Sequence, residues 1–240
     1  ATGNDMSDIF IVALVGALIS LDRTAFLQMM VSQPIVAGPI VGFVLGDPLT
    51  GLTIGCVLEL FWIGDLPVGG SIPPNETTAA VIATSVCIIA CRDIGVTSAL
   101  SLPIMIFSIL VSIPLSIAGQ RVDIFVRNYN RKFALNADGL AEVGNFAHID
   151  RENLKGLFSF FTASFFSLLA LISLGLPVVK TLYPLLPNSE RLVNGFYLSF
   201  YLFISLGIAV LMRTGKGKSM MPIFSAGFLI GMILYQVSFH

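Results

Sequence analysis

The sequence predicts an all-α polytopic membrane protein with broken or re-entrant helices. Of its 240 residues, 55% are hydrophobic and only 11% are charged, and the mean hydropathy is +0.90. Soluble domains carry about 25% charged residues. Long charge-free runs separated by short clusters of charge are typical of helices that cross a bilayer. The length suits a single membrane domain, residues 1–240.

Composition also narrows the class of function. The net charge of −1 and the absence of a basic-aromatic module argue against a nucleic-acid partner. Cys56, Cys87 and Cys91 lie in apolar runs without a CxxC pair, so we expect core residues rather than disulfides or a zinc site. The sequence has no metal-ligand spacing and no GxxxxGK[ST] phosphate loop. No metal, cofactor or ATP-driven motor is therefore predicted.

Eight charge-free runs mark the expected membrane segments: Ile9–Leu21, Thr24–Gly46, Pro48–Leu58, Thr77–Cys91, Ile94–Gln120, Gly156–Val179, Leu192–Met212 and Ser219–Phe239. A full helical span needs about 17–25 residues, and five of the runs are long enough. The runs at 9–21, 48–58 and 77–91 should be re-entrant, broken or extended by polar residues. Asp5 and Asp8 precede the first run where a secretory signal would have basic residues, so we expect a membrane segment there.

The sequence Gly46-Asp47-Pro48 predicts a break between two helices. Glycine can close a helix in a left-handed cap, while Asp47 can cap the next helix and Pro48 fits its first turn. The second helix should run from Pro48 to about Ile63. It would be roughly 24 Å long, short of the roughly 30 Å hydrocarbon core, so we expect it not to cross the bilayer alone.

Glycines recur every four residues on both sides of this break: Gly38, Gly42 and Gly46, then Gly51 and Gly55. This spacing lets neighbouring helix backbones approach closely. Continuing the second series by four reaches Glu59, which shares one helix face with these glycines and with Asp47. A charge at the membrane centre costs about 2.5–3.5 kcal/mol, so this face should point into protein, with Glu59 partnered or wetted.

Residues 69–78 form a second polar interruption. Gly69-Gly70-Ser71 and Pro73-Pro74 prevent a regular helix, and Asn75 can cap a helix that opens at Glu76. Transporters use the free backbone groups of such broken helices to bind substrate.

Residues 120–155 differ from the rest of the chain, because they hold six of its 13 Lys and Arg residues. The apolar residues of this region form a rough helical stripe: Val122, Phe125, Tyr129 and Phe133. We expect an amphipathic helix at the membrane surface, in a charged loop between two apolar halves, with a docking face for a soluble partner as the alternative. Positive-inside counting places the loop in the cytoplasm. The two halves share a weak sequence similarity between Pro34–Gly38 and Pro222–Gly227, which would fit an internal repeat.

The stretch PIVAGPIVGFVLGDPLTGLTIGCVLELFWIGDLPVGGSIPPNE, Pro34–Glu76, resembles the signature region of the mannose/fructose/sorbose-class membrane subunit IIC of the phosphotransferase system (PTS). That family shows a proline-led glycine helix, a Gly-Asp turn, a Leu-Glu pair and a Gly- and Pro-rich loop. Met212–Gly215 and Met220–Pro222 also resemble the family, and the overall plan fits from end to end.

The resemblance implies a sugar-translocating subunit in the bacterial cytoplasmic (inner) membrane, with no catalytic residue of its own. It implies a hexose substrate, a second membrane subunit IID, cytoplasmic IIA and IIB proteins, and a larger oligomer. The substrate-holding part would move against a scaffold in elevator fashion, and IIB would phosphorylate the sugar. In this family the phosphohistidines are on IIA and IIB, and neither His148 nor His240 lies in a recognisable phospho-acceptor setting.

Matching positions carry the family's site onto this sequence. Glu59 fits the intramembrane glutamate and Asp47 the Gly-Asp turn, whereas Asn75 stands where many relatives have Asp. An amide still bonds to sugar hydroxyls but carries no charge, so Asn75 bears on which sugar is bound. The predicted substrate-binding residues are Glu59, Asp65, Asn75 and Glu76. The predicted helix-breaking and close-packing residues are Gly46, Asp47, Pro48, Gly51, Gly55 and Pro74.

Alternatives stay open for both residues and function. Solute contact or gating is favoured for Glu59 over structural pairing, and helix capping is favoured for Asp47 over solute contact. Asn75 and Glu76 fit a helix start and a substrate loop equally well. An ion- or proton-coupled secondary transporter that uses Glu59, and a non-transporting membrane scaffold or sensor, are the alternative functions.

Overall fold

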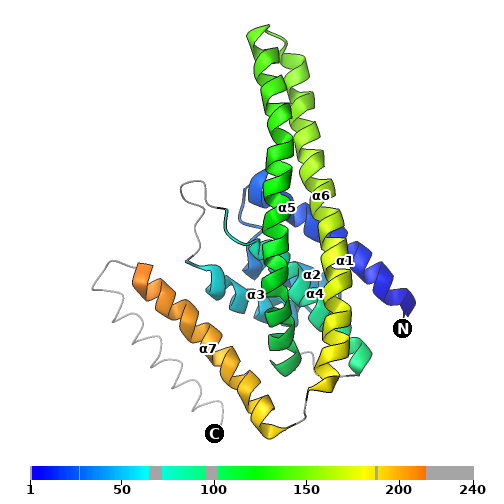
Figure 1. The fold of residues 1–240 in the computed structure, drawn as a ribbon, viewed down its shortest axis with the longest axis vertical. Helices are drawn as coiled ribbons and strands as arrows, with labels where there is room; N and C mark the ends of the chain where they lie inside the picture. The colour runs from blue at the N-terminus through cyan, green and yellow to red at the C-terminus, as the bar shows by residue number, and fades with distance from the viewer. Residues whose placement is uncertain (1, 27, 65–71, 96–101, 187–188, 215–240) are drawn as a thin grey trace.

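The computed structural model describes residues 2–26, 28–64, 72–95, 102–186 and 189–214, and each regular element within them is a helix. In chain order the elements are α1 (Thr2–Thr24), α2 (Pro34–Val44), α3 (Pro48–Trp62), α4 (Glu76–Ile94), α5 (Leu102–Glu142), α6 (Phe146–Leu182), the 3₁₀ turn η1 (Tyr183–Leu185) and α7 (Glu190–Thr214). Figure 1 shows α1 to α4 packed around the lower part of the α5–α6 pair, whose upper part projects beyond them. The all-α class predicted from composition is confirmed.

α2 and α3 are joined by the tight turn that the sequence predicts at residues 46–48. Gly46 has a φ of +84°, a left-handed conformation that is costly for residues with a Cβ. Asp47 then caps α3, because its Oδ1 accepts a hydrogen bond from the Thr50 backbone N at 3.1 Å. The chain reverses here, and α3 returns along α2.

Glycines line both sides of the α2–α3 interface, so the two backbones touch directly. A Cβ added to Gly51 would lie 2.8 Å from the carbonyl carbon of Gly38. One added to Gly42 would lie 2.5 Å from the carbonyl oxygen of Asp47. Real Cβ atoms essentially never come this close, so the four-residue glycine spacing is what permits the contact.

α4 is the buried centre of the fold. Each of its residues from Thr77 to Cys91 is buried, because α1, α2, α3, α5 and α6 all pack against it. A Cβ on Gly119 of α5 would lie 2.8 Å from Thr78 Oγ1, so the backbone of α5 lies directly against the Thr78 side chain of α4. The run expected to be too short to span is extended to the 19 residues of the helix by polar residues at its ends.

The charge-free run at 24–46 is not one spanning helix, so the prediction from its length was wrong. α1 stops where this run begins, and α2 starts only at Pro34. The carboxylate of Asp22 accounts for the interruption. Its Oδ1 accepts from Met29 N at 2.7 Å and its Oδ2 from Ser32 N at 3.1 Å, which holds the intervening backbone in a non-helical path.

The region 120–155, expected to form an amphipathic helix at the membrane surface, is helical, but it belongs to two helices, α5 and α6, that pair in a long antiparallel hairpin. α5 continues as a helix through this charged region, and Asn130 Nδ2 donates to the Gly156 carbonyl at 3.0 Å across the hairpin. The 41 residues of α5 span about 62 Å, twice the thickness of the hydrocarbon core. Of the described side chains in this region, Asp123, Val126 and Glu152 are buried, and the others stay half-buried or exposed. The cytoplasmic placement of this region stays a prediction.

Ion pairs tie three helices together at the start of α1. Lys180 Nζ of α6 lies 2.8 Å from Asp5 Oδ2 of α1 and also pairs with Asp93 of α4. Arg92 of α4 lies 2.7 Å from Asp8 Oδ2 and donates to the Leu45 carbonyl oxygen at 3.1 Å. These contacts fix the end of α4 against α1, α2 and α6.

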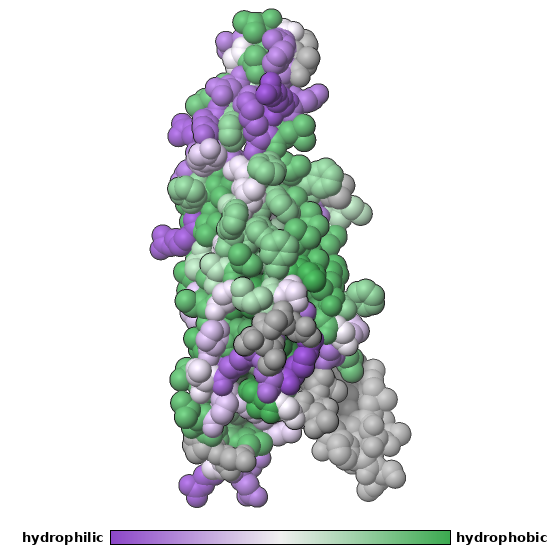
Figure 2. Space-filling model, turned by 90° about the vertical axis from the view of Figure 1, so that its right-hand side faces the viewer, coloured by the Kyte–Doolittle hydropathy of each residue, from purple (hydrophilic) through white to green (hydrophobic). Residues whose placement is uncertain are grey.

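The chain is a multi-pass membrane protein. Within the described residues, α4, α5, α6 and α7 are long and apolar enough to cross a membrane. Figure 2 shows a broad hydrophobic surface below the hydrophilic outer end of the hairpin. The predicted repeat segment Pro222–Gly227 and the run Ser219–Phe239 lie outside the described residues, so the internal repeat stays a prediction.

Candidate functional site

Three of the predicted substrate-binding residues lie where helices begin and end. Thr77 Oγ1, in the first turn of α4, donates to the Ser32 carbonyl oxygen at 2.7 Å, two residues before α2. The starts of α2 and α4 are therefore adjacent, beside the ends of α1 and α3. We call this region the helix junction; it comprises Arg23 and residues 32–35, 59–62, 72–78 and 116–123. The positive dipole ends of two helices meet here, which favours negative charge and hydrogen-bond acceptors.

Glu59 reaches the start of α2 from near the end of α3. Its Oε2 accepts a hydrogen bond from the backbone N of Ile35 at 3.3 Å. The N-cap residue of α2, Gln33, makes no side-chain cap of its own, so Glu59 supplies an acceptor that the helix otherwise lacks. The side chain is half-buried, and Oε1 receives no hydrogen bond from the part of the chain that the structure describes.

Asn75 connects α4 to α5. Its Oδ1 accepts from Thr78 N at 2.9 Å, and its Nδ2 donates to Asp123 Oδ2 at 2.8 Å. Its backbone N donates to the Ser116 carbonyl at 3.1 Å. Asn75 is 4% exposed and Asp123 is 8% exposed, so this carboxylate is paired inside the protein. Asn75 thus caps α4 and holds its first residue against α5.

The segment 72–75 is held by side chains of α5 and α1. Gln120 Nε2 donates to the carbonyl oxygen of Ile72, and Arg23 Nη2 makes a long hydrogen bond of 3.4 Å to the carbonyl oxygen of Pro74. A non-helical segment needs such partners, because its backbone groups are not satisfied by a ladder. Pro74 lies directly before the capping residue, and Glu76 is the half-buried first residue of α4.

The structure separates Asp47 from the helix junction. Asp47 and Glu59 lie at opposite ends of α3, twelve residues or about 18 Å apart along its axis. Both face α2, as the glycine spacing predicts, since Gly51 and Gly55 between them contact its backbone. Asp65 lies outside the described residues, and its predicted role stays a prediction.

One known protein family matches this chain almost from end to end. Residues 6–239 match the family described as the PTS system sorbose-specific IIC component. The chain belongs to this family. The match covers far more than the Pro34–Glu76 stretch on which the resemblance was based.

Individual relatives of this IIC chain carry different sugar names. It is 29% identical over 223 residues to the PTS system mannose-specific EIIC component of Escherichia coli, covering 92% of this chain and 77% of the relative. It is 26% identical over 200 residues to the sorbose-specific EIIC component of Klebsiella pneumoniae, covering 83% and 70%. The fructose permease IIC component of Bacillus subtilis is 28% identical over 198 residues, covering 82% and 69%.

Two solved structures share the fold of this IIC chain. One, described as a membrane protein, has a TM-score of 0.70 and 26% identity, covering 97% of this chain and 87% of that one. The other is the mannose transporter ManYZ in complex with a microcin, with a TM-score of 0.57, 25% identity and the same coverage.

Sequence reasoning missed three residues of the helix junction in this IIC chain. The sequence predicts no site role for Arg23, and it places Gln120 and Asp123 in the charged region 120–155. A signal was available in the spacing of α5. Polar or small residues recur along one face of this apolar helix: Ser112, Ser116, Gly119, Gln120 and Asp123. Three of them, Ser116, Gln120 and Asp123, bond to the segment 72–75.

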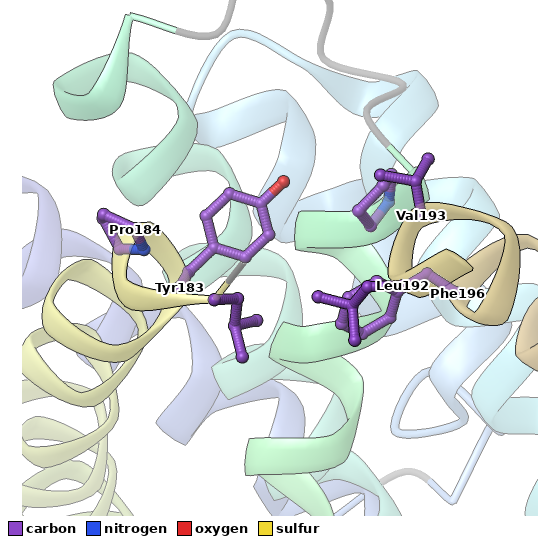
Figure 3. Close-up of a pocket in the computed structure, with 7 residues that line it drawn as sticks. Tyr183, Pro184, Leu192, Val193 and Phe196 are labelled. Carbon is purple, nitrogen blue, oxygen red and sulfur yellow. The ribbon is translucent and has the colours of Figure 1, made fainter. Parts of the chain in front are cut away.

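A separate cleft of about 260 Å³ lies near the connection between α6 and α7 of the IIC chain. Figure 3 shows Tyr183 and Pro184 on one side and Leu192, Val193 and Phe196 of α7 on the other. The cleft contains none of the predicted substrate-binding residues, and its labelled lining is mainly apolar. The cleft is therefore separate from the predicted sugar site.

Proposed function

We propose that this chain is the sugar-translocating IIC subunit of a phosphoenolpyruvate-dependent PTS of the mannose/fructose/sorbose class. It binds a hexose at the helix junction and moves it inward across the bacterial cytoplasmic membrane. Relatives named for mannose, sorbose and fructose support a hexose as the substrate. The chain carries out no phosphoryl transfer itself; IIA and IIB do so, and IIB phosphorylates the arriving sugar.

Partners of the chain follow from the same relatives. The solved structure of ManYZ, a mannose transporter, supports assembly with a IID membrane subunit, and the proposal includes a larger oligomer of the two. α6 and α7 bury few of their apolar side chains within this chain, which supports contacts with lipid or with such a partner.

The observation that carries the proposal is the position of Glu59 at the start of α2. A sugar hydroxyl donates readily to a carboxylate, and Oε1 of Glu59 has capacity left after Oε2 bonds to Ile35 N. Asn75 acts as a positioning residue, because its amide already bonds to Thr78 and Asp123. Glu76 and Asp65 supply further acceptors in this proposal.

The test replaces Glu59 by Gln in the chain co-purified with its membrane partner. The amide oxygen of Gln can still accept from Ile35 N, so the start of α2 is preserved while the charge is lost. We expect the Kd for a radiolabelled hexose to rise at least tenfold, since charge-assisted hydrogen bonds are about twice as strong as neutral ones. Glu142→Gln, at an exposed position at the end of α5, is the matched control and should bind normally.

Different outcomes separate the possible errors. Unchanged binding by Glu59→Gln would show that the carboxylate only caps α2. Failure of the unmodified complex to bind mannose, fructose, sorbose or an amino sugar would overturn the transport proposal and favour a scaffold or sensor. Uptake by the chain alone, driven by a proton gradient, would favour an ion-coupled transporter.

A further inference from the structure

The outer part of the α5–α6 hairpin carries an aromatic groove of about 540 Å³. Its lining includes Phe125, Tyr129 and Phe133 of α5 and Lys155, Phe158 and Phe166 of α6. Phe125 and Phe158 are each 68% exposed, and Phe166 is 64% exposed. Large exposed apolar side chains grouped on one face mark a contact with membrane or with another molecule.

Two lysines lie at one end of this aromatic groove. Lys132 Nζ is 3.5 Å from the centroid of the Tyr129 ring, and Lys155 Nζ is 6.0 Å from that of Phe133. Lys155 also pairs with Glu152, whereas Lys132 forms no ion pair with the described residues. These three side chains sum to a charge of +1 at the outer end of the groove, which is apolar toward Phe166.

The charges that bound the apolar part of α6 position the groove in the bilayer. No charged residue lies between Lys155 and Lys180, and these 25 residue steps span about 37 Å. That distance exceeds the roughly 30 Å hydrocarbon core and is less than the 40–45 Å of the whole bilayer. Lys155 and Lys180 therefore lie at headgroup level, on opposite sides of the membrane.

The length and charge of the groove match one lipid leaflet. From Lys155 to Phe166 is eleven residues, about 16 Å, which is close to half of the hydrocarbon core. The region 120–155 holds six of the 13 Lys and Arg residues, and the positive-inside rule predicts from them a cytoplasmic position, where the leaflet is negatively charged.

We propose that the aromatic groove binds an anionic phospholipid of the cytoplasmic leaflet. One acyl chain lies against Phe158 and Phe166, and the phosphate lies between Lys132 and Lys155. A partner helix that crossed the whole bilayer would continue past the groove, whereas a single lipid fits its one-leaflet length and its cationic end. This inference does not depend on the sugar site.

Native mass spectrometry of the full chain tests the headgroup preference. The chain is titrated with phosphatidylglycerol and phosphatidylcholine of identical acyl chains. We expect preferential retention of phosphatidylglycerol, reduced about fivefold by Lys132→Gln. Lys132 is the informative position, because replacing Lys155 would also remove the ion-pair partner of Glu152. Arg191→Gln, exposed at the start of α7, is the matched control and should leave the preference unchanged.

Photocrosslinking in membranes tests the occupant directly. Phe158 is replaced by the photoreactive p-benzoylphenylalanine in the assembled complex. A phospholipid adduct on the chain supports the proposal, and crosslinking to a protein instead overturns it. Equal retention of the two lipids by the unmodified chain, or an equal loss of preference in Lys132→Gln and Arg191→Gln, also overturns it.

Discussion

The side-chain amide of Asn75 donates to the buried carboxylate of Asp123 at 2.8 Å, across 48 residues of sequence. This hydrogen bond joins the first turn of α4, the most buried helix, to the middle of the long helix α5. Because the same amide caps α4 through Thr78 N, one side chain sets both where the helix starts and what it packs against.

The chemistry of this pair predicts that the amide and the carboxylate can be exchanged between positions 75 and 123. Asn75→Asp keeps an acceptor for Thr78 N but places a second carboxylate against Asp123 inside the protein. We expect a loss of at least about 1–3 kcal/mol of stability, the cost of an unsatisfied buried polar group. Combining Asn75→Asp with Asp123→Asn exchanges amide and carboxylate, and thermal unfolding of the double variant should recover most of the loss. An additive loss in the double variant would contradict this pairing.

Backbone contact between α2 and α3 predicts strong intolerance of even one methyl group. Gly51→Ala places a Cβ 2.8 Å from the Gly38 carbonyl carbon, and both sides of the contact are helix backbone that cannot rotate away. We expect destabilisation of at least about 1–3 kcal/mol, measured as a lower Tm. Gly195→Ala in α7 meets nothing within 4 Å and should be neutral or slightly stabilising. Equal effects of the two substitutions would refute the close packing.

The ion pairs of Lys180 with Asp5 and Asp93 predict that substitutions in α6 and α1 have coupled effects on stability. Lys180→Met leaves Asp5 and Asp93 facing each other without a cation, and all three side chains are at most 25% exposed. We expect a loss above the roughly 0.2–1 kcal/mol typical of exposed pairs. Adding Asp5→Asn should restore part of the Tm, since it removes one of the two repelling charges. No restoration would mean that the effect of Lys180 comes from packing alone.

Local chemistry explains why several elements could be predicted from sequence. The break before α3 could be predicted from neighbouring residues alone. It depends on a glycine in a left-handed turn, the capping Asp47 and the proline that follows. The same holds for the Asn75 cap of α4. The buried face of α3 was also predictable, because close helix contact requires small residues at helical spacing.

Other features depended on partners far away in the chain. The length of the run at 24–46 suggested a span, but the carboxylate of Asp22 holds the backbone between α1 and α2 out of helix. For residues 120–155 the sequence predicts an amphipathic helix in a loop at the membrane surface, because the charge pattern alone cannot show that α5 pairs with α6. Asp123 was placed in that loop for the same reason, although it lies buried against Asn75.

The sequence by itself determined the membrane class, the family, the helix break at residues 46–48 and the glycine face. These depend on composition and on spacings shorter than one or two helical turns. Only the tertiary structure decided that Glu59 reaches the start of α2, that Asp123 holds Asn75, and that α5 and α6 pair along their length. Such contacts join residues that are 24 or more positions apart, and the free energy that selects them comes from burying paired polar groups and apolar faces together.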